Sequence, residues 1–236
     1  ALPAFARNIS YLRDIRHANK GGNAMSTTSM IDSATAKKNR GVWKKEAGEI
    51  RKPGLAHFVM MALFTGVGVV VGTFGSMAVS LGPVSAFWPG QAIQSVGCIW
   101  YGGWGAIAGI VFPLISNAIS GQAALPISIA YIPGNLAQAV VGAWAFHVFN
   151  CDPRLKSTKD WVVYIIFGII IANAIGAAEG NLVLYSFGII TSEAIPLSFL
   201  GWFLGNSVAS GILGVIMLKF LSPLVMKTKT FCKGVW

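Results

Sequence analysis

Long hydrophobic runs, separated by short polar or glycine-rich breaks, make up the chain from about residue 54 onward. A helix needs about 20 apolar residues to cross a bilayer. The runs predict an all-α integral membrane protein with six transmembrane helices in a domain covering residues 56–225. We expect these helices at about 56–80, 87–103, 104–120, 126–149, 161–181 and 197–222. Glycines at 102–103 and the stretch 121–126 mark two of the turns between them.

Residues 182–196, LVLYSFGIITSEAIP, are apolar but short and broken. Three structures fit this pattern: a lid on the non-cytoplasmic side, a re-entrant segment, or an extension of the fifth helix.

The N-terminal pattern differs from that of the spans. Leu2, Phe5, Ile9, Leu12 and Ile15 recur at helical spacing with arginines between them. This predicts a short amphipathic helix over residues 1–22, on the membrane surface or on a partner subunit. A cleaved organellar transit sequence is the alternative. Residues 23–55 are rich in Ser, Thr and Lys and predict a basic flexible linker, and residues 226–236 form a basic tail.

Composition supports the membrane assignment. Hydrophobic residues make up 54% of the chain and charged residues only 11%, against about 25% charged in a typical soluble domain. Lys and Arg fall in three zones: residues 1–52, 154–159 and 219–233. Because basic residues are retained on the cytoplasmic side, we expect both termini and the loop at 150–160 to be cytoplasmic. The expected location is the plasma membrane of a prokaryote.

The first predicted span carries a stripe of small residues four apart, Gly68, Gly72, Ser76 and Ser80. Such stripes let two helices approach closely in lipid. Two interpretations remain open: packing within this protein's own bundle, and an interface with another membrane subunit.

Polar side chains inside the predicted spans gather toward the non-cytoplasmic half. Because unpaired polar groups are costly in hydrocarbon, they are expected to face the bundle interior. Their clustering predicts a pocket that opens outward and binds a small molecule, although interhelical hydrogen bonds that only hold the bundle are the alternative. The candidate binding residues are Trp88, Gln91, Gln94, Asn117, Asn135, Gln138, Glu179 and Asn206.

Four of these candidates carry further information. Gln91 and Gln94 are three residues apart and therefore lie on one face of a helix. Glu179, within GAAEGNL, is a candidate for binding a cationic ligand or a coupling ion. Trp88 lies where interfacial tryptophans are common, so an anchoring role competes with ligand stacking.

No catalytic motif is visible, and we do not expect an enzyme. Cys98, Cys151 and Cys232 are scattered, which argues against a disulfide framework or a zinc site. His57 and His147 are expected at the cytoplasmic ends of helices instead of in a metal site. We expect no cofactor and no nucleic-acid partner.

Residues 56–225 resemble the substrate-binding S components of energy-coupling factor (ECF) vitamin transporters. The likeness lies in the six helices, the small-residue face of the first helix, and the strings WYGGWGAIAGIVFPLISNAISG and IPGNLAQAVVGAW. It implies a ligand pocket toward the outer side, covered by the loops between helices 1 and 2 and between helices 5 and 6. It also implies a coupling membrane subunit at the first helix and two ATPases.

A second resemblance is to the MASE1-type membrane sensor domain of bacterial signalling proteins. It is carried by FWPGQAI, PGNLAQAVVGAW, DPRLKSTKDW and GWFLGNSVASGILGV, in that order. Two features depart from that family: Asn206 follows Gly205 where the family usually has Asp, and six helices replace about eight. About 14 residues follow the last helix, so a sensor of this kind would signal through a partner.

The leading expectation is therefore the substrate-specific subunit of an ATP-driven importer, embedded in the lipid bilayer and bound to other membrane subunits. Ligand would enter past residues 81–90 and 182–196. The alternatives are a MASE1-like sensor domain, and an accessory subunit of a larger membrane complex that docks through its N-terminus.

Overall fold

The computed structural model describes residues 41–45, 52–78, 80–81, 84–85 and 87–236, with the backbone alone at 76–78, 80–81 and 84–85. Residues 42–236 belong to one compact unit. The predictions for residues 1–22 and for most of 23–55 lie outside the described residues.

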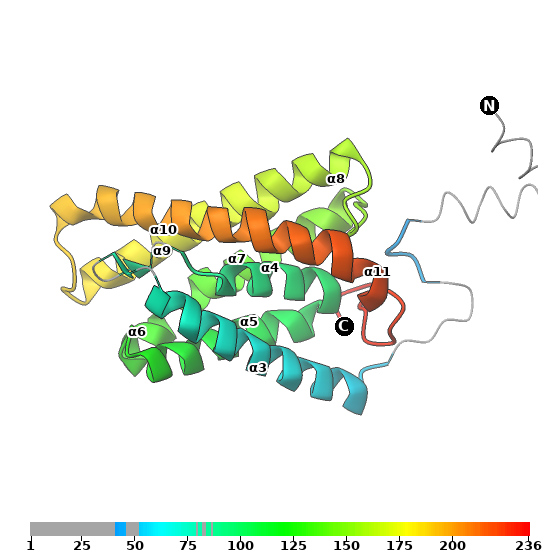
Figure 1. Ribbon diagram of the computed structural model, residues 1–236, viewed down its shortest axis with the longest axis horizontal. Coiled ribbons are helices and arrows are strands. Elements are labelled where there is room, and N and C mark those ends of the chain that lie inside the picture. Colours follow the sequence, from blue (N-terminus) through cyan, green and yellow to red (C-terminus); the bar gives the residue numbers. More distant parts are fainter. Residues whose placement is uncertain (1–40, 46–51, 79, 82–83, 86) are drawn as a thin grey trace, which may run out of the picture. The chain divides into compact units, whose positions relative to one another are not determined.

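The described chain forms six helical segments that run side by side along one axis (Figure 1). They are α3 (Leu55–Ala78); α4 (Gly90–Tyr101); α5 (Gly103–Ser120); α6 (Leu125–Ala130) with α7 (Ile132–Val148); α8 (Thr158–Val163) with η1 (Tyr164–Ile171) and α9 (Ala172–Ser186); and η2 (Ser192–Ala194) with α10 (Ile195–Ala209), η3 (Ser210–Gly214), η4 (Met217–Leu221) and α11 (Ser222–Val225). Two short strands, β1 (Ser80–Leu81) and β2 (Val84–Ser85), pair antiparallel between α3 and α4.

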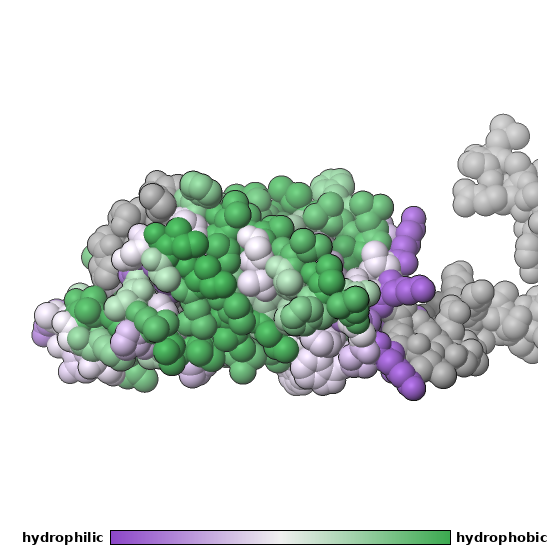
Figure 2. All heavy atoms as spheres, turned by 90° about the horizontal axis from the view of Figure 1, so that it is seen from below, coloured by the Kyte–Doolittle hydropathy of each residue, from purple (hydrophilic) through white to green (hydrophobic). Residues whose placement is uncertain are grey.

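The helical membrane-protein fold is confirmed. Five of the six segments are long and apolar enough to cross a membrane, and each carries large apolar side chains on its outside. Leu63 and Phe74 of α3, for example, are 68% and 69% exposed. Apolar residues cover most of the face seen in Figure 2, with hydrophilic ones gathered at one end. In a bilayer this apolar surface faces lipid.

Helix α4 is the exception among the six. Its 12 residues are all buried and reach only about 18 Å at 1.5 Å per residue. The expected span at 87–103 is therefore shorter than predicted and lies inside the bundle, packed on α3, α5, α7 and α10. It then turns sharply into α5 at Gly102, where φ is +54° and a Cβ would meet the Val235 carbonyl. Both constraints require glycine at this turn.

Helix α3 packs along α5 through its small residues. A Cβ at Gly68 would lie 2.5 Å from the Phe112 ring, and one at Gly72 would lie 3.0 Å from Ser116 Oγ. The Thr73 hydroxyl donates to the same Ser116 oxygen at 3.2 Å. The stripe thus serves packing inside the chain at Gly68 and Gly72, which is the first of the two interpretations. The side chains of Ser76 and Ser80 lie outside the described residues.

Two predicted regions differ in detail. The fourth span is interrupted at Tyr131, because Pro133 follows at the start of α7 and cannot continue the helical hydrogen bonds of α6. Residues 182–186 extend the fifth helix to Ser186, and residues 192–194 form a short turn of helix before α10. Of the three structures considered for 182–196, helix extension is the one observed for its first part.

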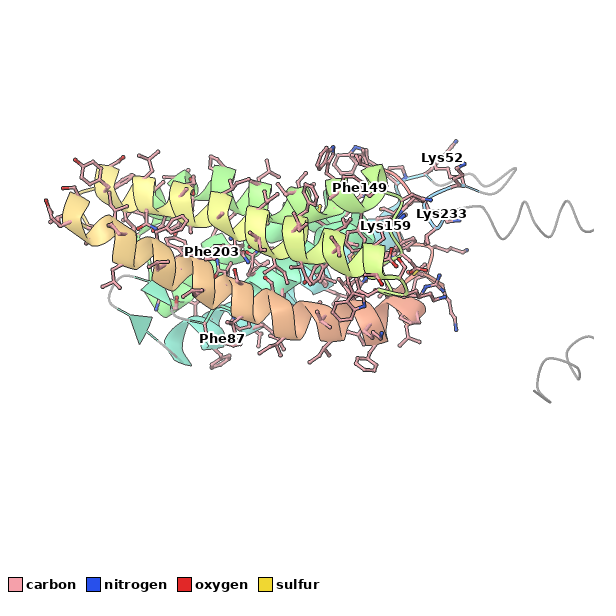
Figure 3. All side chains as sticks on the ribbon, turned by 90° about the horizontal axis from the view of Figure 1, so that it is seen from above. Lys52, Phe87, Phe149, Lys159, Phe203 and Lys233 are labelled. Atoms are coloured by element: carbon pink, nitrogen blue, oxygen red, sulfur yellow. The ribbon has the colours of Figure 1, made fainter. Side chains whose placement is uncertain are left out.

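Basic residues meet at one end of the bundle. Lys52, Lys159 and Lys233 all lie there in Figure 3, together with Phe149. We call this the basic end. Its agreement with the charge pattern supports an even number of passes between the three basic zones.

The loop at the basic end is firmly held. Ser157 and Asp160 form a reciprocal capping box at the start of α8, which stabilises the first turn. Asp152 pairs with Arg154 at 2.6 Å. Burial, followed by the charge of Asp160, raises the pKa of the Cys151 thiol to about 11, so this thiol is protonated and unreactive at neutral pH.

The C-terminal residues fold back over the same end. The Cys232 N–H donates to the Trp100 carbonyl at 2.9 Å, and the Gly103 N–H donates to the Val235 carbonyl at 2.7 Å. Trp43 packs between the rings of His147 and Phe231, with centroids 4.0 and 5.5 Å away. The predicted basic tail is therefore part of the folded unit.

Candidate functional site

Polar side chains are enclosed in the middle of the bundle, where α4, α7, α9 and α10 pack on one another. All are at most 2% exposed, and all are neutral. We call this set the buried polar cluster: Gln91, Gln94, Ser95, Gln138, Asn173, Asn181, Asn206 and Ser210. It contains four of the eight predicted binding residues.

One part of the cluster is hydrogen-bonded internally. The Gln138 amide donates to Asn173 Oδ1 at 3.2 Å, joining α7 to α9. Asn173 in turn donates to Ser207 Oγ at 3.3 Å and to Ser210 Oγ at 3.5 Å, joining α9 to α10 and η3. Gly176 leaves the room that the Gln138 amide occupies. These bonds fit the alternative that polar residues hold the helices together.

The other part of the cluster lacks partners. Among the described residues, both terminal atoms of the Gln91 amide, and both of the Asn206 amide, are buried without a hydrogen-bond partner. Gln94 donates to the Gly109 carbonyl at 2.6 Å, but its oxygen has no partner. A buried polar group left without a partner costs about 1–3 kcal/mol. Native proteins rarely leave two whole amides in this state, so each calls for an explanation.

Four predicted residues lie outside the cluster. Trp88 packs on Phe112 with ring centroids 5.9 Å apart. Asn117 donates to Ser128 Oγ at 3.1 Å, between α5 and α6. Asn135 lies half-buried in the first turn of α7, and Glu179 lies half-buried on α9.

Gln91 and Gln94 do not line the expected outward-opening pocket. Both side chains have no exposed surface, because neighbouring helices close around α4 on every side. One cavity of about 350 Å³ is lined mainly by apolar residues near Gly102 and Trp144, at the basic end. Among the described residues, Gln91 and Gln94 are enclosed by the surrounding helices.

Sequence reasoning passed over two residues of this region. The Tyr164 hydroxyl is fully buried and donates to the Ser210 carbonyl at 2.9 Å. Its position within the apolar run VVYIIFGIII was the available signal, since a buried tyrosine needs a partner for its hydroxyl. Ser95, next to Gln94, is buried with an unpaired hydroxyl near Gly142, and nothing in its sequence context marked it.

The described residues contain no group of three His, Cys, Asp or Glu that could hold a metal ion. The cluster offers hydrogen bonds and no nucleophile–base pair. Its chemistry is recognition of a polar solute or adhesion between helices.

Comparison with known proteins adds no assignment: no family model, no curated protein and no solved structure matches this chain.

Proposed function

We propose that this chain is a solute-binding membrane subunit, and that it acts as the substrate-specific subunit of an ATP-driven importer. The observation that carries the proposal is the pair of unpartnered buried amides, Gln91 on α4 and Asn206 on α10. The two helices pack on each other. The proposed location is the plasma membrane of a prokaryote.

A primary amide has two donors and an acceptor oxygen with two lone pairs. Gln91 and Asn206 therefore have unused capacity for several hydrogen bonds inside the bundle. A small polar solute entering between α4 and α10 would use that capacity and remove the desolvation cost of the empty state. The Gln138–Asn173–Ser210 bonds would keep the other side of the site in place.

Energy for import must come from partners, because the chain has no phosphate-binding loop. The resemblance to S components supplies the expected arrangement, with a coupling membrane subunit and two ATPases. Since Gly68 and Gly72 face α5, a partner at α3 would meet its other side, where Leu63, Val67 and Phe74 are exposed.

Copurification tests the importer assignment. The tagged full chain is extracted from its own host in a mild detergent, and the bound proteins are identified by mass spectrometry. Two ATPases and a membrane subunit are the expected result. A kinase or cyclase would instead favour the sensor, and a large complex without ATPases would favour the accessory role.

Substitution tests the solute site. Small molecules released from the purified chain are compared by mass spectrometry between wild type, Gln91→Leu and Asn206→Leu. A species lost from both variants, yet kept in Gln122→Leu outside the cluster, is the expected result. Retention of every small molecule in the two cluster variants contradicts a site at these amides.

A further inference from the structure

Glu179 is a carboxylate inside a membrane-spanning helix, and among the described residues no positive side chain forms an ion pair with it. No Lys or Arg occurs between Gly54 and Pro153, or between Asp160 and Leu218. Glu179 lies seven residues before the end of α9 at Ser186, about 10 Å from that end. An ionisable group at such a depth is expensive unless it is paired, and its presence indicates function.

The described neighbour of the Glu179 carboxylate is Gly134, in the first turn of α7. Gly134 has no room for a Cβ, because the Glu179 carboxylate occupies that space. Tyr131 lies three residues before Gly134, at the junction of α6 and α7. The two oxygens of a carboxylate accept about four hydrogen bonds, and the Gly134 N–H can satisfy at most one of them.

Two aromatic rings meet next to this part of α9. The rings of Tyr131 and Trp202 meet edge to face, with centroids 5.4 Å apart and planes at 87°. Trp202 of α10 lies against Gly180, the residue after Glu179, where a Cβ would collide with its ring. The faces of Tyr131 and Trp202 that this contact leaves open can attract an ammonium group through cation–π interaction, and the carboxylate of Glu179 adds a charge of opposite sign.

We propose that Tyr131, Glu179 and Trp202 form a binding site for an organic ammonium cation. The inference rests on the proposed solute binding and assigns the class of solute: one with a positively charged nitrogen, held at Glu179. Its polar remainder would extend toward the neighbouring buried polar cluster, which Asn181 of α9 joins to this region.

An organic ammonium fits this site better than a metal ion. Ca²⁺ takes six to eight oxygen ligands and Mg²⁺ requires an octahedral set, whereas one carboxylate and two aromatic faces come together here. An ammonium carrying methyl or methylene groups is less strongly hydrated and gains from the faces of Trp and Tyr.

The test uses the full chain in lipid nanodiscs and tetramethylammonium chloride as the probe. Thermal unfolding is followed against probe concentration, with NaCl at the same ionic strength as the reference. A saturable rise in Tm with tetramethylammonium alone is expected, because a ligand that binds only the folded state stabilises it. Glu179→Gln is expected to weaken the apparent affinity by at least about tenfold.

Variants of the two aromatic residues test the contribution of their rings separately from that of the Glu179 charge. Trp202→Leu and Tyr131→Leu are expected to weaken binding several-fold, whereas Tyr131→Phe keeps the ring and should bind like wild type. These variants also keep the test valid if Glu179→Gln does not fold.

Three results would overturn the proposal: an equal rise with NaCl, no rise with tetramethylammonium, or unchanged affinity in Glu179→Gln. None of them affects ATPase copurification, so the failure of this inference and the failure of the importer assignment can be told apart.

Discussion

The basic end and the buried polar cluster both enclose polar side chains, but they differ in whether those side chains have hydrogen-bond partners. At the basic end, Trp43 Nε1 donates to the Cys151 carbonyl at 2.8 Å, and Trp100 Nε1 donates to Ser222 Oγ at 2.8 Å. The Ser222 hydroxyl in turn donates to the Pro153 carbonyl at 3.1 Å. In the cluster, the amides of Gln91 and Asn206 have no partner.

This difference in hydrogen bonding distinguishes groups that hold the fold together from groups that could bind a solute. A fully paired network holds elements together and gains nothing from a further molecule, because its donors and acceptors are used. An unpaired amide gains from any solute that completes it. The paired network of Trp43, Trp100 and Ser222 therefore fits a structural role, and the unpartnered amides of Gln91 and Asn206 support the proposed solute site.

The largest expected effect is at the basic end. Asp160 is 3% exposed and accepts from the N–H groups of Asp152 and Ser157 at 3.0 and 2.8 Å. Asp160→Ala removes a charged acceptor from both, and we expect it to lower the free energy of unfolding by about 3 kcal/mol. Thermal unfolding in detergent measures this, and Lys156→Ala in the same loop is the control. A loss below that of the control would mean that the capping box adds nothing.

Within the cluster, Gln138 is hydrogen-bonded, and we expect its substitution to lower stability, as at the basic end. Gln138→Leu leaves Asn173 Oδ1 without its donor. We expect a loss of about 1.5 kcal/mol in the free energy of unfolding, measured by the same unfolding experiment. An unchanged stability would show that this interhelical bond contributes nothing to the bundle.

Substitution of the unpaired Gln91 should raise stability instead. Gln91→Leu and Gln138→Leu are the same chemical change and form a matched pair. Gln91→Leu replaces two buried, unpartnered atoms by apolar ones of similar volume. We expect a gain of about 1 kcal/mol in the free energy of unfolding without solute, measured by thermal unfolding alongside Gln138→Leu. Destabilisation by both substitutions would remove the distinction between the two parts of the cluster.

The smallest effect concerns pH at the basic end. Burial acts to raise the pKa of Asp152, but the hydrogen bonds and charge of Arg154 outweigh it and leave the pKa lowered. The carboxylate therefore stabilises the fold above its unfolded pKa of about 3.9, and this contribution is lost as pH falls through the folded value.

Because the pair is partly exposed, with side chains 17% and 32% accessible, we expect less than about 0.5 kcal/mol. The measurement is the difference in stability between pH 7 and pH 3, compared with the same difference in Asp152→Asn. An equal pH dependence in wild type and Asp152→Asn would assign the acid effect to other carboxylates.

Much of the architecture follows from the sequence. Long apolar runs predicted the helical bundle, and the clustering of Lys and Arg predicted that residues 52, 159 and 233 share one end. The stop at Gly102 was visible as a turn signal. The short, central position of α4 was not predicted. Its run is less apolar than the other spans and carries Gln91, Gln94 and Ser95, which was the available signal, but only the helices around it show that it is enclosed.

The candidate site was predictable in composition but not in arrangement. The sequence marked Gln91, Gln94, Gln138 and Asn206 as polar residues inside spans, and all four are enclosed together. It could not say that Gln138 is paired and Gln91 is not. It also grouped Asn117 with them, although that side chain bonds to Ser128 in another part of the bundle.

Hydropathy and charge depend on composition along one dimension, so the sequence alone determined a multi-span helical protein with a basic end. Hydrogen bonding depends on the rotation and depth of each helix relative to its neighbours, which no single segment specifies. Only the tertiary structure decided which amides are satisfied, that Gly68 and Gly72 face α5, and that the Glu179 carboxylate lies against Gly134. The physical reason is that a contact depends on the positions of two helices, whereas hydrophobicity depends on the residues of one helix.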